Sequence, residues 1–270
     1  KQPIIITRID ENKIKAYFNI CQHRGGPIVD ENNCYQQFQC QYHGWIYTNE
    51  GKLKNARGFD KDELKKSDFN LKEINVSVWN GLMFINFDKR CNSLESIYEK
   101  LEKRISKRNF SSYQFYKRDS YNIACNWKIY MDNYLEGLHI PIVHPELNKT
   151  INYKSYKTET HDQFSLQWCS IDPQLNPYKN DSSEDLIAYY VTIFPNVILN
   201  IAPGRLQTNI VEPIDEKNCL VHFDYYFDQI DEKQIQKDLD FSDVIQREDI
   251  EICESVQASY QAEGFKNGII

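Results

Sequence analysis

The chain has 270 residues, with 32 Lys and Arg against 39 Asp and Glu, and a formal net charge of −7 at pH 7. This excess of acid argues against nucleic acid and anionic membranes as main partners, and no apolar run is long enough to predict a membrane span. No signal peptide opens the chain, so we expect a cytoplasmic protein, and we expect a trimmed N-terminus because the first residue is Lys1 rather than Met.

The first 88 residues predict an all-β region. Short runs rich in β-branched and aromatic residues recur there and are typical of strands. Asn80-Gly81 predicts a tight hairpin turn between the last two runs, and Glu50-Gly51 marks another turn. The predicted strands are residues 4–6, 15–18, 36–38, 76–79 and 82–85.

The second part of the chain mixes helical and strand patterns. Apolar residues at helical spacing predict a helix over 94–105, which we expect to connect two domains. From about residue 112 onward, the order of elements fits a curved antiparallel sheet that grips a long C-terminal helix. The predicted elements are a strand over 113–124, a helix over 127–138, several strands within 153–169 and 186–227, and a final helix over 232–262.

Two Cys/His pairs are the most specific motif in the chain. Cys21 and His23 form one pair, Cys40 and His43 form the other, and sixteen residues separate the two. Two thiolates on one iron and two imidazoles on the other are the ligand set of a Rieske [2Fe–2S] cluster. Tetrahedral zinc also accepts two Cys and two His. Zinc fingers usually pair Cys with Cys and His with His, so the mixed pairs favour the Rieske cluster.

The other six cysteines show no paired spacing. We therefore expect buried, reduced thiols rather than disulfides. These residues are Cys34, Cys91, Cys125, Cys169, Cys219 and Cys253.

A second candidate metal site follows in the sequence. Glu136 and His139 are three residues apart, which predicts neighbouring positions on one helix face. His144 comes five residues after His139, but Pro141 and Pro145 disfavour a regular helix there, so His144 can turn back toward His139. Two His and one carboxylate form the facial triad of non-haem Fe(II) oxygenases. Taken alone, the two histidines also fit ordinary surface or core positions. A Rieske cluster needs an electron acceptor, however, so the cluster motif and the histidines together predict a mononuclear iron site.

The final predicted helix offers the third ligand. Asp249 lies on its apolar stripe, whereas Glu248 lies nearer the edge of that stripe. An ionised acid on a core face is costly unless it is paired or bound to metal. We therefore expect Asp249 to be the carboxylate ligand, with Glu248 as the alternative and a core ion pair as the explanation without metal. The stripe consists of Phe241, Ile245, Ile252 and Val256.

With these two motifs, the chain resembles the catalytic α subunit of Rieske non-haem iron oxygenases over nearly all of its 270 residues. Within that family it is most similar to the branch of choline monooxygenase and glycine-betaine monooxygenase. The ligand motifs are specific to the family, and the other segments are only suggestive of the branch. The segments that carry the resemblance are 40–45, 79–88, 126–139, 194–200 and 248–257.

The resemblance implies an α+β protein with two domains. Residues 1–90 are expected to form an all-β Rieske [2Fe–2S] domain, without the segment that usually precedes it. Residues 91–270 are expected to form a helix-grip (START-like) catalytic domain with an antiparallel sheet, without the segment that usually follows the last helix. The residues that match the cluster ligands are Cys21, His23, Cys40 and His43.

The same resemblance implies the second metal and the partners. His139, His144 and Asp249 match the ligands of a mononuclear Fe(II). Glu136, the candidate catalytic acid, matches the residue that bridges His139 to a cluster histidine, taken as His43, of the neighbouring subunit in a head-to-tail homotrimer. The implied activity is that of a terminal oxygenase, which takes electrons from a flavin-containing reductase or ferredoxin, activates O2 and hydroxylates a small organic substrate.

Two alternative functions need less of the chain. A Rieske electron carrier has no need of residues 112–270, and respiratory-type carriers form a disulfide beside the cluster where this chain has Gly26 and Tyr42. A binding module that has lost catalysis has no need of an intact ligand set. Both alternatives are therefore disfavoured against an oxygenase.

The substrate is the least determined property. A quaternary ammonium compound such as choline or a betaine fits the resemblance and requires an aromatic cage. The alternative is an aromatic compound, as for an aromatic-ring-hydroxylating dioxygenase, and the sequence does not distinguish a monooxygenase from a dioxygenase. The candidate cage residues are Trp168, Tyr189, Tyr190 and Phe194.

Overall fold

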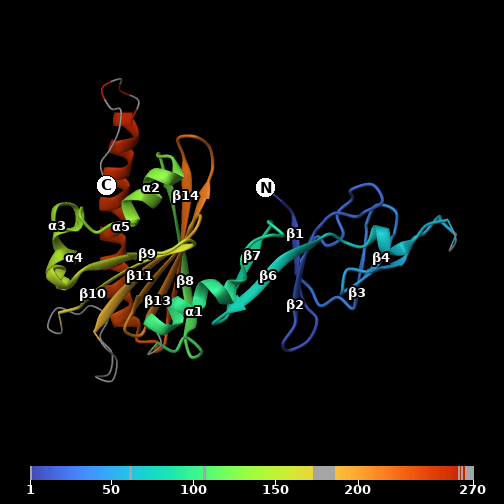
Figure 1. The fold of residues 1–270 in the computed structure, drawn as a ribbon, viewed down its shortest axis with the longest axis horizontal. Coiled ribbons are helices and arrows are strands. Elements are labelled where there is room, and N and C mark those ends of the chain that lie inside the picture. Colours follow the sequence, from blue (N-terminus) through green and yellow to red (C-terminus); the bar gives the residue numbers. More distant parts are fainter. Residues whose placement is uncertain are drawn as a thin grey trace. The chain divides into compact units, whose positions relative to one another are not determined.

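The computed structural model describes residues 2–60, 63–105, 108–172, 186–260, 262 and 264. The chain divides into two compact units, Lys1–Leu94 and Glu95–Ile270. Figure 1 shows short strands in the first unit and a larger sheet with helices in the second. The predicted α+β class is confirmed, because all the strand pairs described are antiparallel and the helices of the second unit accompany one sheet.

Two small antiparallel sheets build the first unit. One has the strand order β1-β2-β6-β7, and the other has the order β3-β4-β5. Asn80 and Gly81 both have positive φ angles, 47° and 82°, and form the predicted hairpin turn from β6 to β7. The elements are β1 (Ile4–Arg8), β2 (Ile14–Phe18), β3 (Gln37–Gln39), β4 (Ile46–Thr48), β5 (Leu53–Asn55), the 3₁₀ helix η1 (Lys66–Phe69), β6 (Glu73–Trp79) and β7 (Leu82–Asn86).

A shared aromatic core joins the two small sheets. Tyr17 of β2 belongs to the same buried cluster as Tyr47 of β4, and the candidate thiols of Cys21 and Cys40 lie in that cluster too. Gly51 has a φ of 75°, and a Cβ built there would lie 2.5 Å from Cε1 of Tyr17, so only glycine fits this turn without displacing the ring. The two cysteines are therefore held in place by packing against this core.

A seven-stranded antiparallel sheet dominates the second unit. Its strand order is β8-β14-β13-β12-β11-β10-β9. Strand β14 alternates buried and less buried residues over much of its length, whereas β13 is buried on both faces from Arg205 to Asn209. The strands are β8 (Gln114–Ile123), β9 (Lys157–Thr160), β10 (Phe164–Ser170), β11 (Ile187–Ile193), β12 (Val197–Ala202), β13 (Arg205–Pro213) and β14 (Cys219–Phe227).

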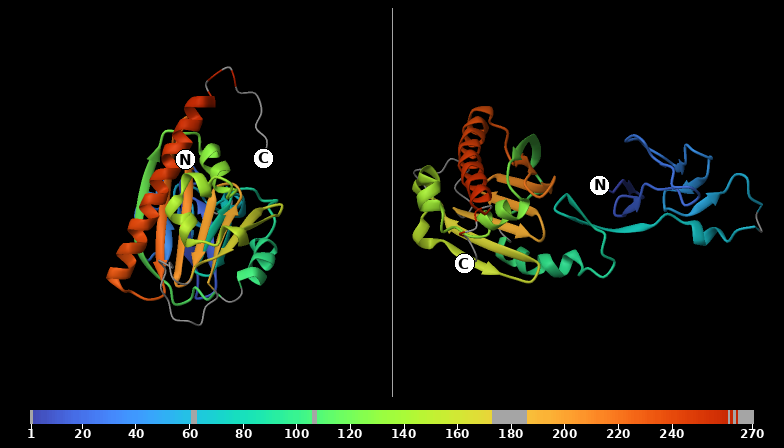
Figure 2. Two further views of the ribbon diagram at one scale, coloured as in Figure 1. Left: turned by 90° about the vertical axis from the view of Figure 1, so that its left-hand side faces the viewer. Right: turned by 90° about the horizontal axis from the view of Figure 1, so that it is seen from above.

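Helix α5 (Glu232–Tyr260), 29 residues long, lies along one face of this sheet (Figure 2). Its Ile235 and Leu239 share a buried cluster with Val221 of β14, and this apolar packing holds the helix against the sheet. The predicted helix ran to Ala262, and Gln261 lies outside the described residues. The stripe predicted by helical spacing over 94–105 is also confirmed, since α1 (Leu94–Ile105) buries Tyr98 among others.

The helix predicted over 127–138 is shorter in the structure. Helix α2 (Trp127–Tyr134) begins where the Asn126 side chain accepts a hydrogen bond from the Lys128 amide, 3.0 Å away. Because α2 ends at Tyr134, Glu136 lies in the irregular segment that follows it, and the prediction that it shares a helix face with His139 is wrong. The remaining helices are α3 (Ile140–Val143), α4 (Pro145–Thr150) and the 3₁₀ helix η2 (Tyr153–Ser155).

Candidate metal centres

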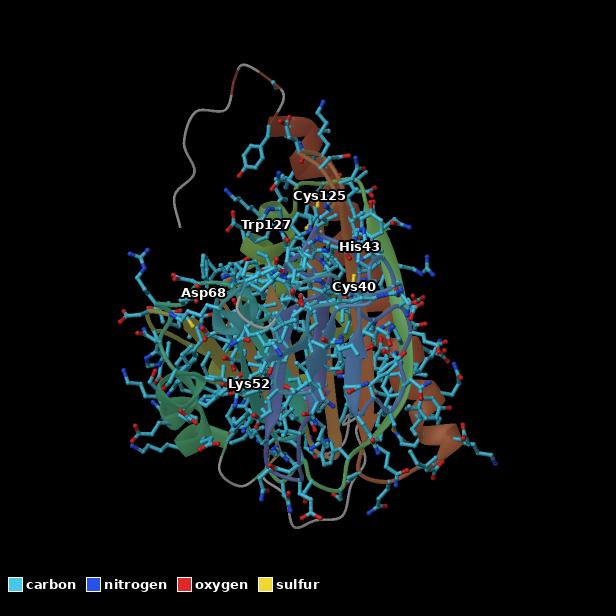
Figure 3. The ribbon with its side chains drawn as sticks, turned by 90° about the vertical axis from the view of Figure 1, so that its right-hand side faces the viewer. Cys40, His43, Lys52, Asp68, Cys125 and Trp127 are labelled. Carbon is cyan, nitrogen blue, oxygen red and sulfur yellow. The ribbon has the colours of Figure 1, made fainter. Side chains whose placement is uncertain are left out.

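The two candidate cluster loops have the same backbone pattern. In each loop the cysteine N–H donates to the carbonyl five residues later, over 2.9 Å, and the glycine four residues later donates back to the cysteine carbonyl. These glycines, Gly25 and Gly44, have φ angles of 72° and 71°, a conformation that favours glycine. Each loop is thus a closed turn that carries one Cys and one His. Figure 3 labels Cys40 and His43 of the second loop.

The two candidate cysteine ligands are buried, whereas His23 and His43 are partly exposed. Cys21 and Cys40 are each 2% exposed, and burial raises the pKa of the Cys21 thiol. The rings of His23 and His43 lie 4.6 Å apart between centroids. Burial lowers the pKa of His23, which favours the neutral ring that a metal requires.

The donor set of these loops fits a Rieske cluster. The Nδ1 atom of His23 is buried and has no hydrogen-bond partner among the described residues. A Cβ built on Gly26 would lie 3.1 Å from Sγ of Cys40, so the backbone approaches the sulfur closely there. An unpartnered imidazole nitrogen beside two buried thiols is the arrangement that a [2Fe–2S] centre would complete. All eight cysteines lie among the described residues, and none of them forms a disulfide. The expectation of burial is wrong for Cys34, which is exposed, and for Cys91, which is partly buried.

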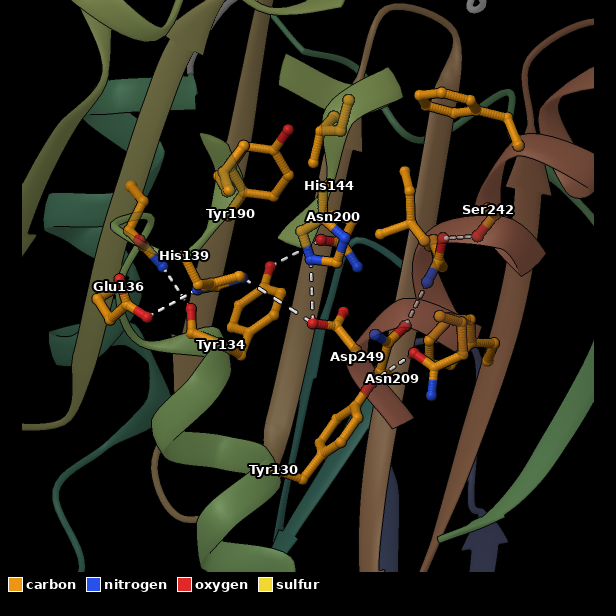
Figure 4. A pocket seen from close by; sticks show the side chains of 18 of the residues that line it. Tyr130, Tyr134, Glu136, His139, His144, Tyr190, Asn200, Asn209, Ser242 and Asp249 are labelled. Carbon is orange, nitrogen blue, oxygen red and sulfur yellow. Dashed lines mark hydrogen bonds and ion pairs between the residues drawn. The ribbon is translucent and has the colours of Figure 1, made fainter. Parts of the chain in front are cut away.

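A second set of donors converges in the other unit. One ligand atom each from His139, His144 and Asp249 lies within 4.8 Å of the others. Oδ1 of Asp249 lies 3.1 Å from Nε2 of His144 and 3.9 Å from Nε2 of His139. Two ligands about 2.1 Å from one metal at a right angle lie about 3 Å apart, so the spacing fits a single ion (Figure 4).

A carboxylate holds the outer nitrogen of each histidine. Oε1 of Glu136 lies 2.7 Å from Nδ1 of His139, and Oε2 of Glu248 lies 2.7 Å from Nδ1 of His144. Such contacts orient a ring and leave Nε2 for a metal. Burial opposes a charge on His144, but Asp249 and Glu248 outweigh it and raise its pKa. Glu248, the alternative ligand in the sequence analysis, therefore lies behind the ring.

Beside these donors lies a cavity of about 110 Å³. Of the four aromatic residues predicted to face it, Tyr190 does, whereas Trp168, Tyr189 and Phe194 do not line it. Phe194 is 71% exposed. Side chains alternate along β11, so Tyr189 and Tyr190 cannot both face the same side. The other aromatic residues that line the cavity are Tyr130, Tyr134, Tyr156, Phe223 and Phe241.

Polar residues that the sequence analysis missed form another part of the wall. Arg205, Gln207 and Asn209 of β13 line the cavity together with Gln246 of α5. A weak signal was present, because Arg205, Gln207 and Asn209 occupy every second position of this strand and therefore share one face. From the sequence alone, this spacing is also typical of a strand with one face exposed to solvent. Only the structure shows that both faces of β13 are buried here.

Comparisons with known proteins bear on both units. Residues 1–76 match the model of the Rieske [2Fe-2S] domain, and residues 110–270 match that of the ring hydroxylating alpha subunit (catalytic domain). No helix of the described residues is both long and apolar enough to cross a membrane.

Two curated relatives and one solved structure are similar over almost the whole chain. Choline monooxygenase of Arabidopsis thaliana is 30% identical over 98% of the chain and 66% of its own length. The carnitine monooxygenase oxygenase subunit of Acinetobacter pittii is 28% identical over 97% of the chain and 73% of its own length. The structure of the quaternary ammonium Rieske monooxygenase CntA with an inhibitor has a TM-score of 0.79 at 25% identity, over 97% of this chain and 73% of that one. The chain spans 61–66% of the length of the choline monooxygenases that it matches.

Proposed function

The chain belongs to the family of Rieske-domain proteins with a ring-hydroxylating α-subunit catalytic domain, and on that premise we propose that it is a terminal oxygenase for a small quaternary ammonium compound. The observation that carries the proposal is the convergence of His139, His144 and Asp249 beside the cavity. When bound, the cluster supplies electrons one at a time and the mononuclear Fe(II) activates O2.

The side chains of the site prepare it for that chemistry. Glu136 and Glu248 fix the two imidazole rings from behind, and the Asn133 amide donates to Oδ1 of Asp249 over 2.6 Å. Three protein ligands would leave a bound Fe(II) with open coordination positions. His139, His144, Asp249 and the cluster residues Cys21, His23, Cys40 and His43 are accordingly the proposed metal ligands.

The aromatic part of the wall suits a quaternary ammonium group. The ring of Tyr190 lies 6.4 Å from that of Tyr134 and 6.3 Å from that of Tyr156, between centroids. Rings grouped in this way attract a cation that has no hydrogen bonds to offer. The names of the relatives, choline and carnitine monooxygenase, support the same class of substrate. An arene would stack on the same rings, but it would leave the polar wall without partners.

The proposed partners follow from the family. A flavin-containing reductase or ferredoxin would supply electrons, and the active form would be a homotrimer in which Glu136 bridges His139 to His43 of the neighbouring subunit. The Glu136 side chain is 32% exposed while Oε1 holds His139, so the carboxylate is accessible to a neighbour.

The proposal is tested by oxygen uptake with iron-loaded protein, a reductase and a set of candidate substrates. We expect choline, glycine betaine or carnitine to stimulate uptake and to gain an oxygen atom from ¹⁸O₂. Naphthalene and toluene serve as arene controls, and stimulation by these alone would support the ring-hydroxylating alternative. We also expect about three irons per chain, two in the cluster and one in the mononuclear site.

A further inference from the structure

Three polar side chains of β13 form a buried row along one wall of the cavity. Arg205, Gln207 and Asn209 are two residues apart, so they point to the same face of the sheet. They are 5%, 2% and 2% exposed, respectively. Asp238 of α5 pairs with the first of them, with Nε of Arg205 2.8 Å from Oδ2 of Asp238.

The row has a fixed direction because a guanidinium donates hydrogen bonds and cannot accept them. Nη2 of Arg205 donates to Oε1 of Gln207. The amide of Gln207 is thereby oriented, and its Nε2 donates to Oδ1 of Asn209 over 2.7 Å. Because Oδ1 of Asn209 accepts from Gln207, its Nδ2 group, with two N–H donors, is oriented away from Gln207. Figure 4 labels Asn209, Asp249 and Tyr130, which all line this cavity.

The side-chain amide of Gln246 also has its oxygen engaged by a donor of the protein. Oε1 of Gln246 accepts a hydrogen bond from the Tyr130 hydroxyl over 2.8 Å. Its Nε2 is buried and has no partner among the described residues. Gln246 precedes Asp249 by three residues on α5, so the two side chains are neighbours on the helix surface. An unpartnered buried donor is destabilising until a ligand supplies an acceptor.

We infer that Asn209 and Gln246 bind a carboxylate of the substrate, so the substrate is a betaine, which carries both a quaternary ammonium and a carboxylate, rather than choline. This inference rests on the proposed function. The quaternary ammonium accepts and donates no hydrogen bonds, so the two NH₂ groups need another part of the substrate. A carboxylate offers two oxygens with about four acceptor positions, whereas the hydroxyl of choline offers fewer and brings its own donor.

Four isosteric probes separate the two ends of the substrate. Glycine betaine carries a carboxylate where choline carries an alcohol. The compounds 3,3-dimethylbutanoate and 3,3-dimethylbutanol form a second pair with the same difference, but a neutral carbon replaces the charged nitrogen in both. Calorimetric titration of the iron-loaded chain, without reductant, gives each affinity. We expect each carboxylate to bind at least about 10-fold more tightly than its alcohol, the size of one charge-assisted hydrogen bond.

The variant Asn209→Asp keeps the acceptor for Gln207 and replaces the donor by an anionic oxygen. We expect it to weaken both carboxylates by about 10-fold or more and to leave both alcohols within about 3-fold. Asn122→Asp, an exposed position on β8, makes the same chemical change away from the cavity and should alter nothing. Gln246→Glu, which keeps an acceptor for Tyr130, should repeat the result if Asn209→Asp does not fold.

The outcomes distinguish this inference from the proposed function. Equal affinity for carboxylates and alcohols in the unmodified chain, or equal losses for both in Asn209→Asp, would overturn the carboxylate site. Equal affinity for the nitrogen and carbon probes would instead contradict the quaternary ammonium substrate while the carboxylate preference stands. Failure of all four probes to bind would overturn both.

Discussion

Glu248 and His144 form a contact that the sequence did not reveal: Oε2 of Glu248 lies 2.7 Å from Nδ1 of His144. The next residue, Asp249, approaches the opposite nitrogen of the same ring, with 3.1 Å between Oδ1 and Nε2. Two adjacent acids of α5 therefore reach opposite sides of one buried imidazole. The first orients the ring and the second faces the other metal donors, so the two acids should respond differently to substitution.

Glu248→Gln should weaken iron binding without abolishing it. The amide removes the negative charge that favours a proton on Nδ1 and a free Nε2, and changes of this kind typically cost about 10–100-fold in metal affinity. Competition with a chelator, read by iron content, measures the effect. Glu251→Gln, on an exposed turn of the same helix, is the matched control. If both variants retain iron equally, Glu248 does not support His144.

Asp249→Ala should empty the mononuclear site while the red colour of the cluster persists. The substitution removes one of three donors within 4.8 Å of each other, and the loss should exceed that in Glu248→Gln. Iron analysis together with visible absorption separates the two metals. A folded variant with full iron and full turnover would exclude Asp249 as the ligand.

Glu136→Gln should leave both metals bound but slow the reoxidation of a reduced cluster by O2 and substrate. The acid lies 2.7 Å from Nδ1 of His139 and is proposed to reach a neighbouring subunit as well. We expect a loss of about 10–100-fold in the single-turnover rate, measured by stopped-flow absorption. An unchanged rate, with both irons present, would show that electrons take another route.

Cys40→Ser should abolish the visible absorption of the cluster and leave the mononuclear iron in place. The two sets of donors belong to separate compact units, so loss of one should not dismantle the other. Electron paramagnetic resonance of the reduced protein checks the first expectation, and iron content checks the second. A normal Rieske spectrum in this variant would refute the assignment of Cys40.

The buried pair of Asp238 and Arg205 predicts a specific pH dependence. Burial raises the pKa of Asp238 to about 6 from an ordinary 3.8, although Arg205 opposes the rise. An acid with a raised folded pKa stabilises the fold at low pH, and that contribution is lost as the pH rises through the folded value. Between pH 5 and 7 the unmodified chain should lose about 1.4 kcal/mol of stability relative to Asp238→Asn.

Calorimetric melting of both proteins at pH 5, 6 and 7 tests this expectation. The difference between the two proteins matters more than either melting temperature, because other groups titrate in both. A gain for the unmodified chain as the pH rises would mean that the ion pair with Arg205 outweighs the burial of Asp238.

The sequence by itself determined the class of fold and the cofactor chemistry. Close pairs of Cys and His, a hairpin at Asn80-Gly81 and an acid on an apolar helix stripe are local patterns, because the residues that define them are neighbours along the chain. The family and the α+β fold that they indicated are confirmed. The ligand assignments remain predictions, although the structure brings the donors of the mononuclear site together.

The tertiary structure decided what depends on residues far apart in sequence. Glu248 meets His144 across 104 positions, and Tyr130 meets Gln246 across 116. The direction of the row from Arg205 to Asn209 depends on which face of β13 is covered by α5, a fact that alternation along one strand does not contain. Helical spacing also placed Glu136 on a helix that ends two residues earlier, because local periodicity does not register where tertiary contacts terminate a helix.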